Sequence, residues 1–156
     1  MPQIFRWKVV RWILVAIPLI FVAIQFAPVE RSNPPAEAEV PAPASVRVIL
    51  RRACYDCHSN ETVWPWYSRV APMSWLVAHD VREGRKELNF STWNRIGTRQ
   101  QVKKLKESWK EVDEGEMPPW YYLSMHRDAT LSAEDRAALH NWALSTAPAP
   151  AGESGN

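Results

Sequence analysis

The chain has 156 residues, which is long enough for one domain with a hydrophobic core and too short for several. Its 19 Lys and Arg residues exceed its 17 Asp and Glu residues by two, and three of the bases precede an N-terminal apolar run, so the rest of the chain is near neutral. A near-neutral body argues against a nucleic-acid binder, which needs a basic surface to meet phosphate. The sequence also contains no Gly-rich phosphate loop, so nucleotide chemistry has no support.

Residues 1–27 combine a basic start with a long apolar run. Arg6, Lys8 and Arg11 lie near the beginning, and residues 12–27 read WILVAIPLIFVAIQFA. A positive start before an apolar run is typical of a signal peptide or of a signal anchor. Because no small-residue cleavage site follows directly, we expect an uncleaved transmembrane anchor rather than a cleaved signal. The positive-inside rule then places the chain that follows on the outer face of the membrane.

The remainder of the chain divides by composition into a tether, a domain and a tail. Residues 28–44, PVERSNPPAEAEVPAPA, contain five prolines and predict a semi-extended tether with no packed element. Residues 45–147 are expected to form the domain, and residues 148–156 a loose tail. No run of alternating β-branched residues indicates a strand, so the domain is predicted to be all-α.

The domain begins with a predicted helix that has an apolar stripe. Ser45 is the expected N-cap, and Val46, Ile49, Leu50 and Ala53 follow at the spacing of one helix face. This stripe leads directly into the first of the two cysteines. The helix is therefore expected to fix the position of the residues after it.

Two further helices are expected in the middle of the domain. Pro72 suits the first turn of a helix over 72–88, and Ser91 suits the N-cap of a helix over 92–112. Residues 113–130 are expected to form a loop.

A last helix is predicted at the end of the domain. Ser132 with Asp135 three residues later has the pattern of a capping box, which opens a helix to about Ser145. We expect Leu139 and Trp142 of this helix to pack on the apolar stripe of the first helix.

The motif that indicates chemistry is Cys54-Tyr-Asp-Cys57-His58. The pattern C-x-x-C-H is the attachment site of a c-type haem. Two thiols one helical turn apart can add to the two vinyl groups at one edge of the porphyrin. The histidine that follows then lies beneath the ring and can bind the iron through its imidazole.

Two other interpretations of the cysteine pair are weaker. A redox dithiol is expected in a βαβ setting, which the sequence does not suggest. A structural zinc site needs four ligands, and the sequence holds no second cysteine pair.

The second axial ligand of the iron is left open between several residues. Met117 is favoured, because it stands in a Gly-containing loop as Glu-Met-Pro-Pro, and small c-type cytochromes commonly supply methionine from such a loop. His79 and His126 are the alternatives. A five-coordinate iron, open to small ligands on its other side, is a further alternative. Histidine and methionine ligation together raise the potential relative to two histidines.

Aromatic and basic residues surround these candidates in sequence. Trp64, Trp66 and Tyr67 either form a wall of the haem pocket or close a loop over the core. The five bases of Arg99–Lys110 are expected to form a solvated helix face, with a docking patch for a redox partner as the alternative.

With these residues identified, the chain resembles a bacterial haem-binding domain family with a single C-x-x-C-H. The resemblance covers about residues 45–145, through the blocks CYDCHSNETVWPWYSRVAPMSW, HDVREGRKELNFSTW and GEMPPWYYLSMHRDATLS. It implies one covalently attached haem c and an exported domain. It also implies that Cys54 and Cys57 attach the haem and that His58 is a ligand of its iron. It does not choose between Met117, His79 and His126, and it does not settle the reaction.

The sequence therefore predicts a small cytochrome c-like helical domain behind one N-terminal transmembrane helix. We expect a monohaem c-type cytochrome on a bacterial cytoplasmic membrane, with the haem domain in the periplasm or on the outer face. One-electron transfer with redox protein partners is the expected role. Neither nucleic-acid binding nor an enzymatic activity of its own is expected, with a peroxidase-like activity left open. A haem-based sensor, or an accessory subunit of a larger oxidase or peroxidase complex, is the alternative.

Overall fold

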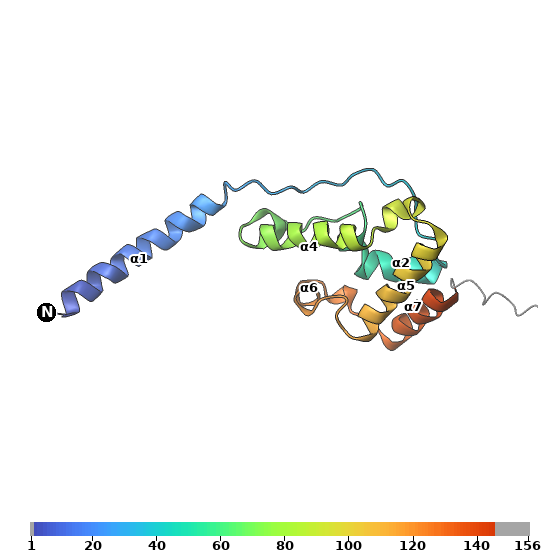
Figure 1. Ribbon diagram of the computed structural model, residues 1–156. Helices are drawn as coiled ribbons and strands as arrows, with labels where there is room; N and C mark the ends of the chain where they lie inside the picture. Colours follow the sequence, from blue (N-terminus) through green and yellow to red (C-terminus); the bar gives the residue numbers. More distant parts are fainter. Residues whose placement is uncertain (1, 146–156) are drawn as a thin grey trace, which may run out of the picture. The chain divides into compact units, whose positions relative to one another are not determined.

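The computed structural model describes residues 2–145, with side chains from residue 7 onward. Every regular element in this part of the chain is helical, and it contains no strand (Figure 1). The predicted all-α class is therefore confirmed. The predicted tail, residues 148–156, lies outside the described residues. The described residues divide into two compact units, unit 1 with residues 2–32 and 64–80, and unit 2 with residues 33–63 and 81–145.

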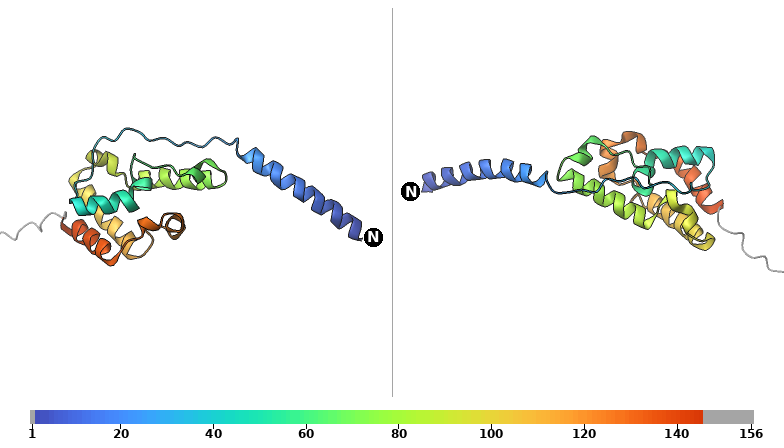
Figure 2. Two further views of the ribbon diagram at one scale, coloured as in Figure 1. Left: turned by 180° about the vertical axis from the view of Figure 1, so that it is seen from behind. Right: turned by 90° about the horizontal axis from the view of Figure 1, so that it is seen from above.

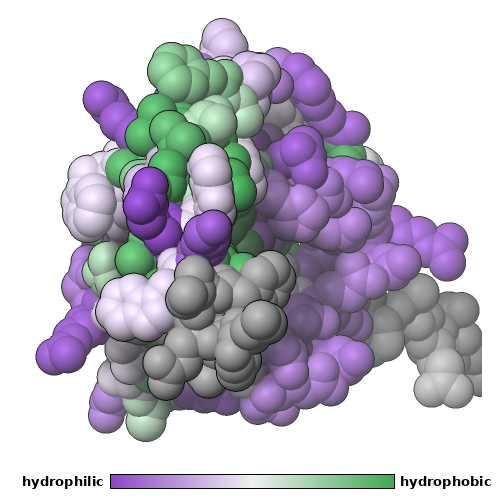
Figure 3. Space-filling view, turned by 90° about the vertical axis from the view of Figure 1, so that its left-hand side faces the viewer, coloured by the Kyte–Doolittle hydropathy of each residue, from purple (hydrophilic) through white to green (hydrophobic). Residues whose placement is uncertain are grey.

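Unit 1 contains the long apolar helix α1, Pro2–Ile24. Its 23 residues extend over about 35 Å, which matches the hydrocarbon core of a bilayer. Over Trp7–Ile24 none of the helix is buried, and hydrophobic surface can be seen on the side of the molecule where the chain begins (Figure 3). By length and composition α1 can therefore cross a membrane. An N-terminal signal sequence meets the same two criteria. The other helical segments of unit 1 are the short helix η1, Trp66–Arg69, and the first part of α4, Met73–Glu87.

Unit 2 contains the end of α4 and most of the shorter helices (Figure 2). These are α2 Ala44–Ala53, α3 Tyr55–His58, η2 Phe90–Arg95, α5 Thr98–Asp113, α6 Trp120–Met125, η3 Arg127–Ala129 and α7 Ala133–Ser145. Helix α7 contacts both α2 and α5. The core of unit 2 lies among these three helices.

The predicted contact between the first and last helices of the domain is confirmed. Val46 and Ile49 of α2 and Leu139 and Trp142 of α7 belong to one buried cluster. The indole Nε1 of Trp142 also donates a hydrogen bond of 3.1 Å to the carbonyl oxygen of Pro41. Full burial of one such aliphatic side chain contributes about 1.5–3 kcal/mol, so this contact is a main source of stability for the domain.

Several helix ends differ from the sequence predictions. Helix α2 begins at Ala44 after Pro43, and Ser45 lies inside it rather than at its N-cap. Proline already fixes the extended backbone that a helix N-terminus requires, so no capping side chain is used. The capping box of α7 is confirmed in both directions. The Ser132 hydroxyl accepts from the backbone N–H of Asp135, and the Asp135 carboxylate accepts from the backbone N–H of Ser132.

The predicted helix over 92–112 is divided in two. Its first residues form the short helix η2, where the side chain of Asn89 accepts from the backbone N–H of Ser91. Thr92 leaves helical geometry, and the chain starts again as an α-helix only after Gly97. The predicted loop over 113–130 is also wrong in part, since it contains α6 and η3.

The predicted tether is not free along its whole length. Its residues 33–43 have no helix, yet Val40 is only 1% exposed and belongs to the core of unit 2. The backbone N–H groups of Glu37 and Ala38 both donate to the carbonyl oxygen of Ser91, at 2.8 and 3.1 Å. An extended Pro-rich chain has no hydrogen bonds between its own backbone groups, so these N–H groups donate to the backbone of the domain instead.

A glycine in α4 permits a close contact between α4 and the C-x-x-C-H segment. A Cβ atom added at Gly84 would lie 2.6 Å from the carbonyl oxygen of Cys57, which is too short for any real contact. Because the obstacle is backbone rather than a flexible side chain, the helix and the segment would have to move apart.

We expect Gly84→Ala to destabilise the protein by about 2 kcal/mol, because an added methyl group overpacks this contact. Gly97→Ala is the matched control. A Cβ at that position meets nothing within 4 Å, and its φ of −72° suits any residue. Urea unfolding followed by far-ultraviolet circular dichroism measures both variants, and equal losses in the two would contradict the contact at Gly84.

Candidate functional site

The C-x-x-C-H motif lies where two helices of unit 2 meet end to end. Helix α2 ends at Ala53, Cys54 leaves helical geometry, and α3 runs from Tyr55 to His58. The buried face of α2 fixes this junction, because it packs into the core immediately before the cysteine. Cys54 packs against the same core, and burial raises the pKa of its thiol to about 12.

The imidazole of His58 is held by two carbonyl groups at the end of α4. Its Nδ1 lies 2.9 Å from the carbonyl oxygen of Gly84 and 3.2 Å from that of Leu88. The carbonyl oxygen of Gly84 also accepts from the backbone N–H of Leu88 at 2.9 Å, and its second lone pair is available to a donor from outside the helix. Because both oxygens are acceptors, Nδ1 carries the proton.

This arrangement leaves the second nitrogen of His58 ready for a metal. With the proton on Nδ1, the neutral ring keeps a lone pair on Nε2. Burial also lowers the pKa of His58, which favours the neutral ring over the imidazolium. A hydrogen bond from the other ring nitrogen is the usual way in which proteins orient a histidine ligand.

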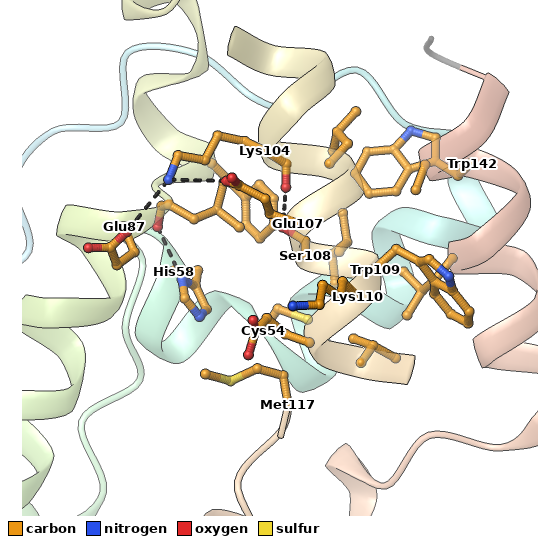
Figure 4. Close-up of a pocket in the computed structure, with 18 of the residues that line it drawn as sticks. Cys54, His58, Glu87, Lys104, Glu107, Ser108, Trp109, Lys110, Met117 and Trp142 are labelled. Carbon is orange, nitrogen blue, oxygen red and sulfur yellow. Dashed lines mark hydrogen bonds and ion pairs between the residues drawn. The ribbon is translucent and has the colours of Figure 1, made fainter. Parts of the chain in front are cut away.

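A cavity of about 700 Å³ opens beside this histidine, and it is built entirely from unit 2. The size is within the usual range for sites that hold a small molecule or a cofactor. Its walls come from α2, the motif, the end of α4, α5, the loop before α6, and α7. Figure 4 shows Cys54, His58 and Met117 around the same space.

The structure thus brings together three of the residues singled out in the sequence. Cys54 and His58 of the motif line the cavity. Met117, which follows His58 by 59 residues in the sequence, lines the same cavity. Met117 is 37% exposed, and its backbone N–H donates to the carbonyl oxygen of Glu111 at 3.1 Å. That bond holds the loop against the end of α5.

The other candidates do not line this cavity. Cys57 is partly buried on α3, with its carbonyl oxygen toward Gly84. His126 follows α6, where its ring stacks on Tyr122 with centroids 4.1 Å apart. His79 is an exposed residue of α4 in unit 1. Roles for these residues in binding iron stay predictions.

The aromatic residues after the motif also belong to unit 1. Trp64, Trp66 and Tyr67 are not among the residues that line the cavity, so their role as a pocket wall stays a prediction.

Helix α5 supplies a wall of the cavity that the sequence patterns did not lead us to expect. It was expected to be a solvated basic face, yet Leu105, Trp109 and Val112 line the cavity. Their spacing of four and three residues is that of one helix face, and this signal was available in the sequence. The many Lys and Glu residues between them concealed it.

Charged side chains of α5 lie at the same cavity. Lys104 is the most enclosed of them, at 24% side-chain exposure, and its Nζ lies 3.6 Å from carboxylate oxygens of both Glu87 and Glu107 (Figure 4). Lys103 and Lys110 also line the cavity, each in an ion pair on its own helix or at its end. The wall is therefore apolar toward the core and mixed in charge near the solvent.

Comparison with known proteins identifies the class of domain. Residues 19–145 match the family model described as the haem-binding domain. No curated protein and no solved structure gives a match. The matched range takes in most of the chain, including the motif, α5, the Met117 loop and α7. The chain therefore belongs to the haem-binding domain family, as the sequence blocks suggested.

Proposed function

We propose that this protein is a membrane-anchored monohaem c-type cytochrome that transfers single electrons on the outer side of the cytoplasmic membrane. The observation that supports this most is the arrangement of the site. His58, with its Nδ1 proton held by two carbonyls, lies beside a cavity that also contains Cys54 and Met117. Membership of the haem-binding domain family supplies the cofactor class.

The residues at the cavity fit a haem. Its lining is mainly apolar, as a porphyrin face requires, and His58 offers a neutral imidazole nitrogen to a metal. When bound, haem supplies an iron that alternates between the ferric and ferrous states, which is one-electron chemistry. Cys54 and Cys57 would hold it covalently, each through addition of a thiol S–H across a vinyl double bond.

The remaining side chains of the wall would orient the group. Met117 would offer its thioether sulfur as the second axial ligand, with its loop held by the bond to Glu111. Lys104 would offer an ammonium donor to a carboxylate of the bound group, in exchange for its ion pairs with Glu87 and Glu107.

The membrane part of the proposal is supported by α1. The helix is long and apolar enough to cross a bilayer, and its bases lie near its N-terminal end. An uncleaved α1 would keep the haem domain close to membrane-bound donors and acceptors. The domain would then be on the outer side, where c-type haem is attached.

The identity of the second ligand is tested by absorption spectroscopy. The wild-type protein, made with c-type maturation machinery, should be low-spin in both oxidation states and should not bind carbon monoxide. Met117→Ala should become high-spin or bind carbon monoxide, because it loses the axial thioether. Met125→Ala is the matched control, since Met125 is exposed on α6 and does not line the cavity.

Other outcomes of this experiment have definite meanings. A low-spin spectrum in Met117→Ala would contradict the assignment and direct attention to His79 or His126. Carbon monoxide binding by the wild type would instead favour a sensor or ligand-binding protein over an electron carrier.

Covalent attachment is tested on the cysteines. Haem should remain with the wild-type polypeptide through acid–acetone extraction, because thioether bonds survive this treatment. In a Cys54→Ser, Cys57→Ser double variant the haem should be extracted completely. Intact-mass spectrometry checks both proteins, and retention of haem by the double variant would contradict the c-type assignment.

Anchoring is tested by removal of the apolar segment. Replacement of residues 1–27 by a cleavable export signal should release a soluble red domain, because its membrane-spanning helix is gone. Carbonate extraction of membranes from cells with the full chain is the comparison. If the truncated protein stays with the membranes through carbonate extraction, which removes peripheral proteins, α1 is not the anchor.

A further inference from the structure

In unit 1 the end of the apolar helix is joined to a loop more than 40 residues later in the chain. Gln25, the first residue after α1, uses its whole side-chain amide for this contact. Its Nε2 donates to the carbonyl oxygen of Ala71 at 3.2 Å, and its Oε1 accepts from the backbone N–H of Ala71 at 2.9 Å. The same Nε2 also donates to the carbonyl oxygen of Phe21, so the amide is fixed to the helix itself.

A second bond holds the same loop a few residues further on. The guanidinium Nη1 of Arg31 donates to the carbonyl oxygen of Ser68 at 2.9 Å, and Ser68 is fully buried. Ala71 is also buried. The loop and the short helix η1 are therefore attached to the chain just past α1 by polar contacts at two points.

Around these buried residues the segment presents large apolar side chains to the outside. Trp66 is 73% exposed, and its ring meets that of Tyr67 edge to face. The other exposed apolar residues of the segment are Val70, Met73, Trp75 and Leu76, and Phe26 is exposed on the chain next to Gln25. We call these six residues the aromatic collar.

Charge is almost absent from the same stretch of sequence. From Trp64 to His79 the only Asp, Glu, Lys or Arg is Arg69, which is exposed. Exposed apolar surface of this kind is costly in water and marks a contact with a partner or a membrane. Arg69 can keep its charged head in the headgroup layer while its apolar stem lies along the neighbouring side chains.

The position of the contact decides between these partners. The apolar part of α1 ends at Ile24, so Gln25 lies where a spanning helix leaves the hydrocarbon. Ala71 is within hydrogen-bond distance of that residue, and the collar lies within five residues of Ala71 or directly beside Gln25. Tryptophan is enriched at this depth, where an indole ring meets both apolar chains and water.

We propose that the aromatic collar is a membrane-binding surface that sits in the outer headgroup layer of the bilayer, held at that depth by Gln25. The inference rests on the proposed membrane anchoring of α1 and assigns a second contact with lipid to the same protein. It concerns unit 1 alone.

The test is hydroxyl-radical footprinting of the full-length protein in nanodiscs of phosphatidylethanolamine and phosphatidylglycerol. Peptide mass spectrometry then gives a rate of oxidation for each tryptophan. Trp120 on α6 is the matched control, because it has the same side chain and is 80% exposed. Trp66 should be oxidised several-fold more slowly than Trp120, and equal rates would overturn the proposal.

A substitution of Gln25 tests whether this residue holds the collar at the membrane surface. Gln25→Ala removes both hydrogen bonds to Ala71 and leaves the apolar run of α1 unchanged. We expect the oxidation of Trp66 to rise toward the rate of Trp120, because Arg31 alone then holds the loop, while the protein stays in the carbonate-resistant membrane fraction. Unchanged protection of Trp66 would show that Gln25 does not hold the collar.

Photo-cross-linking identifies what covers Trp66 and protects it from oxidation. A Trp66→p-benzoylphenylalanine variant should form adducts with lipid, and adducts with a second protein chain would overturn the assignment to the membrane. Failure of the anchor itself is distinguishable. In that case the wild-type protein leaves the membrane on carbonate treatment, whereas failure of the collar alone leaves it bound with Trp66 oxidised.

Discussion

The hydrogen bond from His58 to the end of α4 is the contact on which the site depends. It places a proton on Nδ1, leaves Nε2 available and fixes the plane of the ring. The bond exists only because the carbonyl of Gly84 comes within 2.9 Å of the ring, and a side chain at position 84 would collide with Cys57. A backbone constraint in one helix thus controls the chemistry of a side chain in another.

The cavity and the hydrophobic core of unit 2 are made from the same residues. Leu50, Leu105, Leu139 and Trp142 belong to the buried cluster and also line the cavity. A group bound there completes the core, so its binding free energy adds to the stability of the folded domain. This coupling is typical of small domains, whose own core is limited by their size.

The chain between the apolar helix and the domain has more structure than its composition suggests. Polar side chains attach one loop to the chain at Gln25 and Arg31, and Val40 inserts into the core of unit 2. Proline prevents helix and sheet in this stretch, and it leaves backbone groups that must bond elsewhere. The prolines therefore favour an extended strap that follows other elements over a loose linker.

The local patterns of the sequence were sufficient for the helical class, the buried stripe of α2 and the capping box of α7, because each depends on residues close together in the chain. The haem-binding family was recognised from several sequence blocks in the right order. The tertiary structure alone decided which residues meet at the cavity. Met117 joins Cys54 and His58 there, and α5 turns an apolar face hidden among its charges toward them. It also decided that residues 33–43 pack on the domain, through hydrogen bonds to Ser91 that no local pattern announces. Sequence spacing can show that a helix has an apolar face, as it does for α5. Which distant segment covers that face, or accepts a given backbone hydrogen bond, depends on how the folded chain brings its segments together.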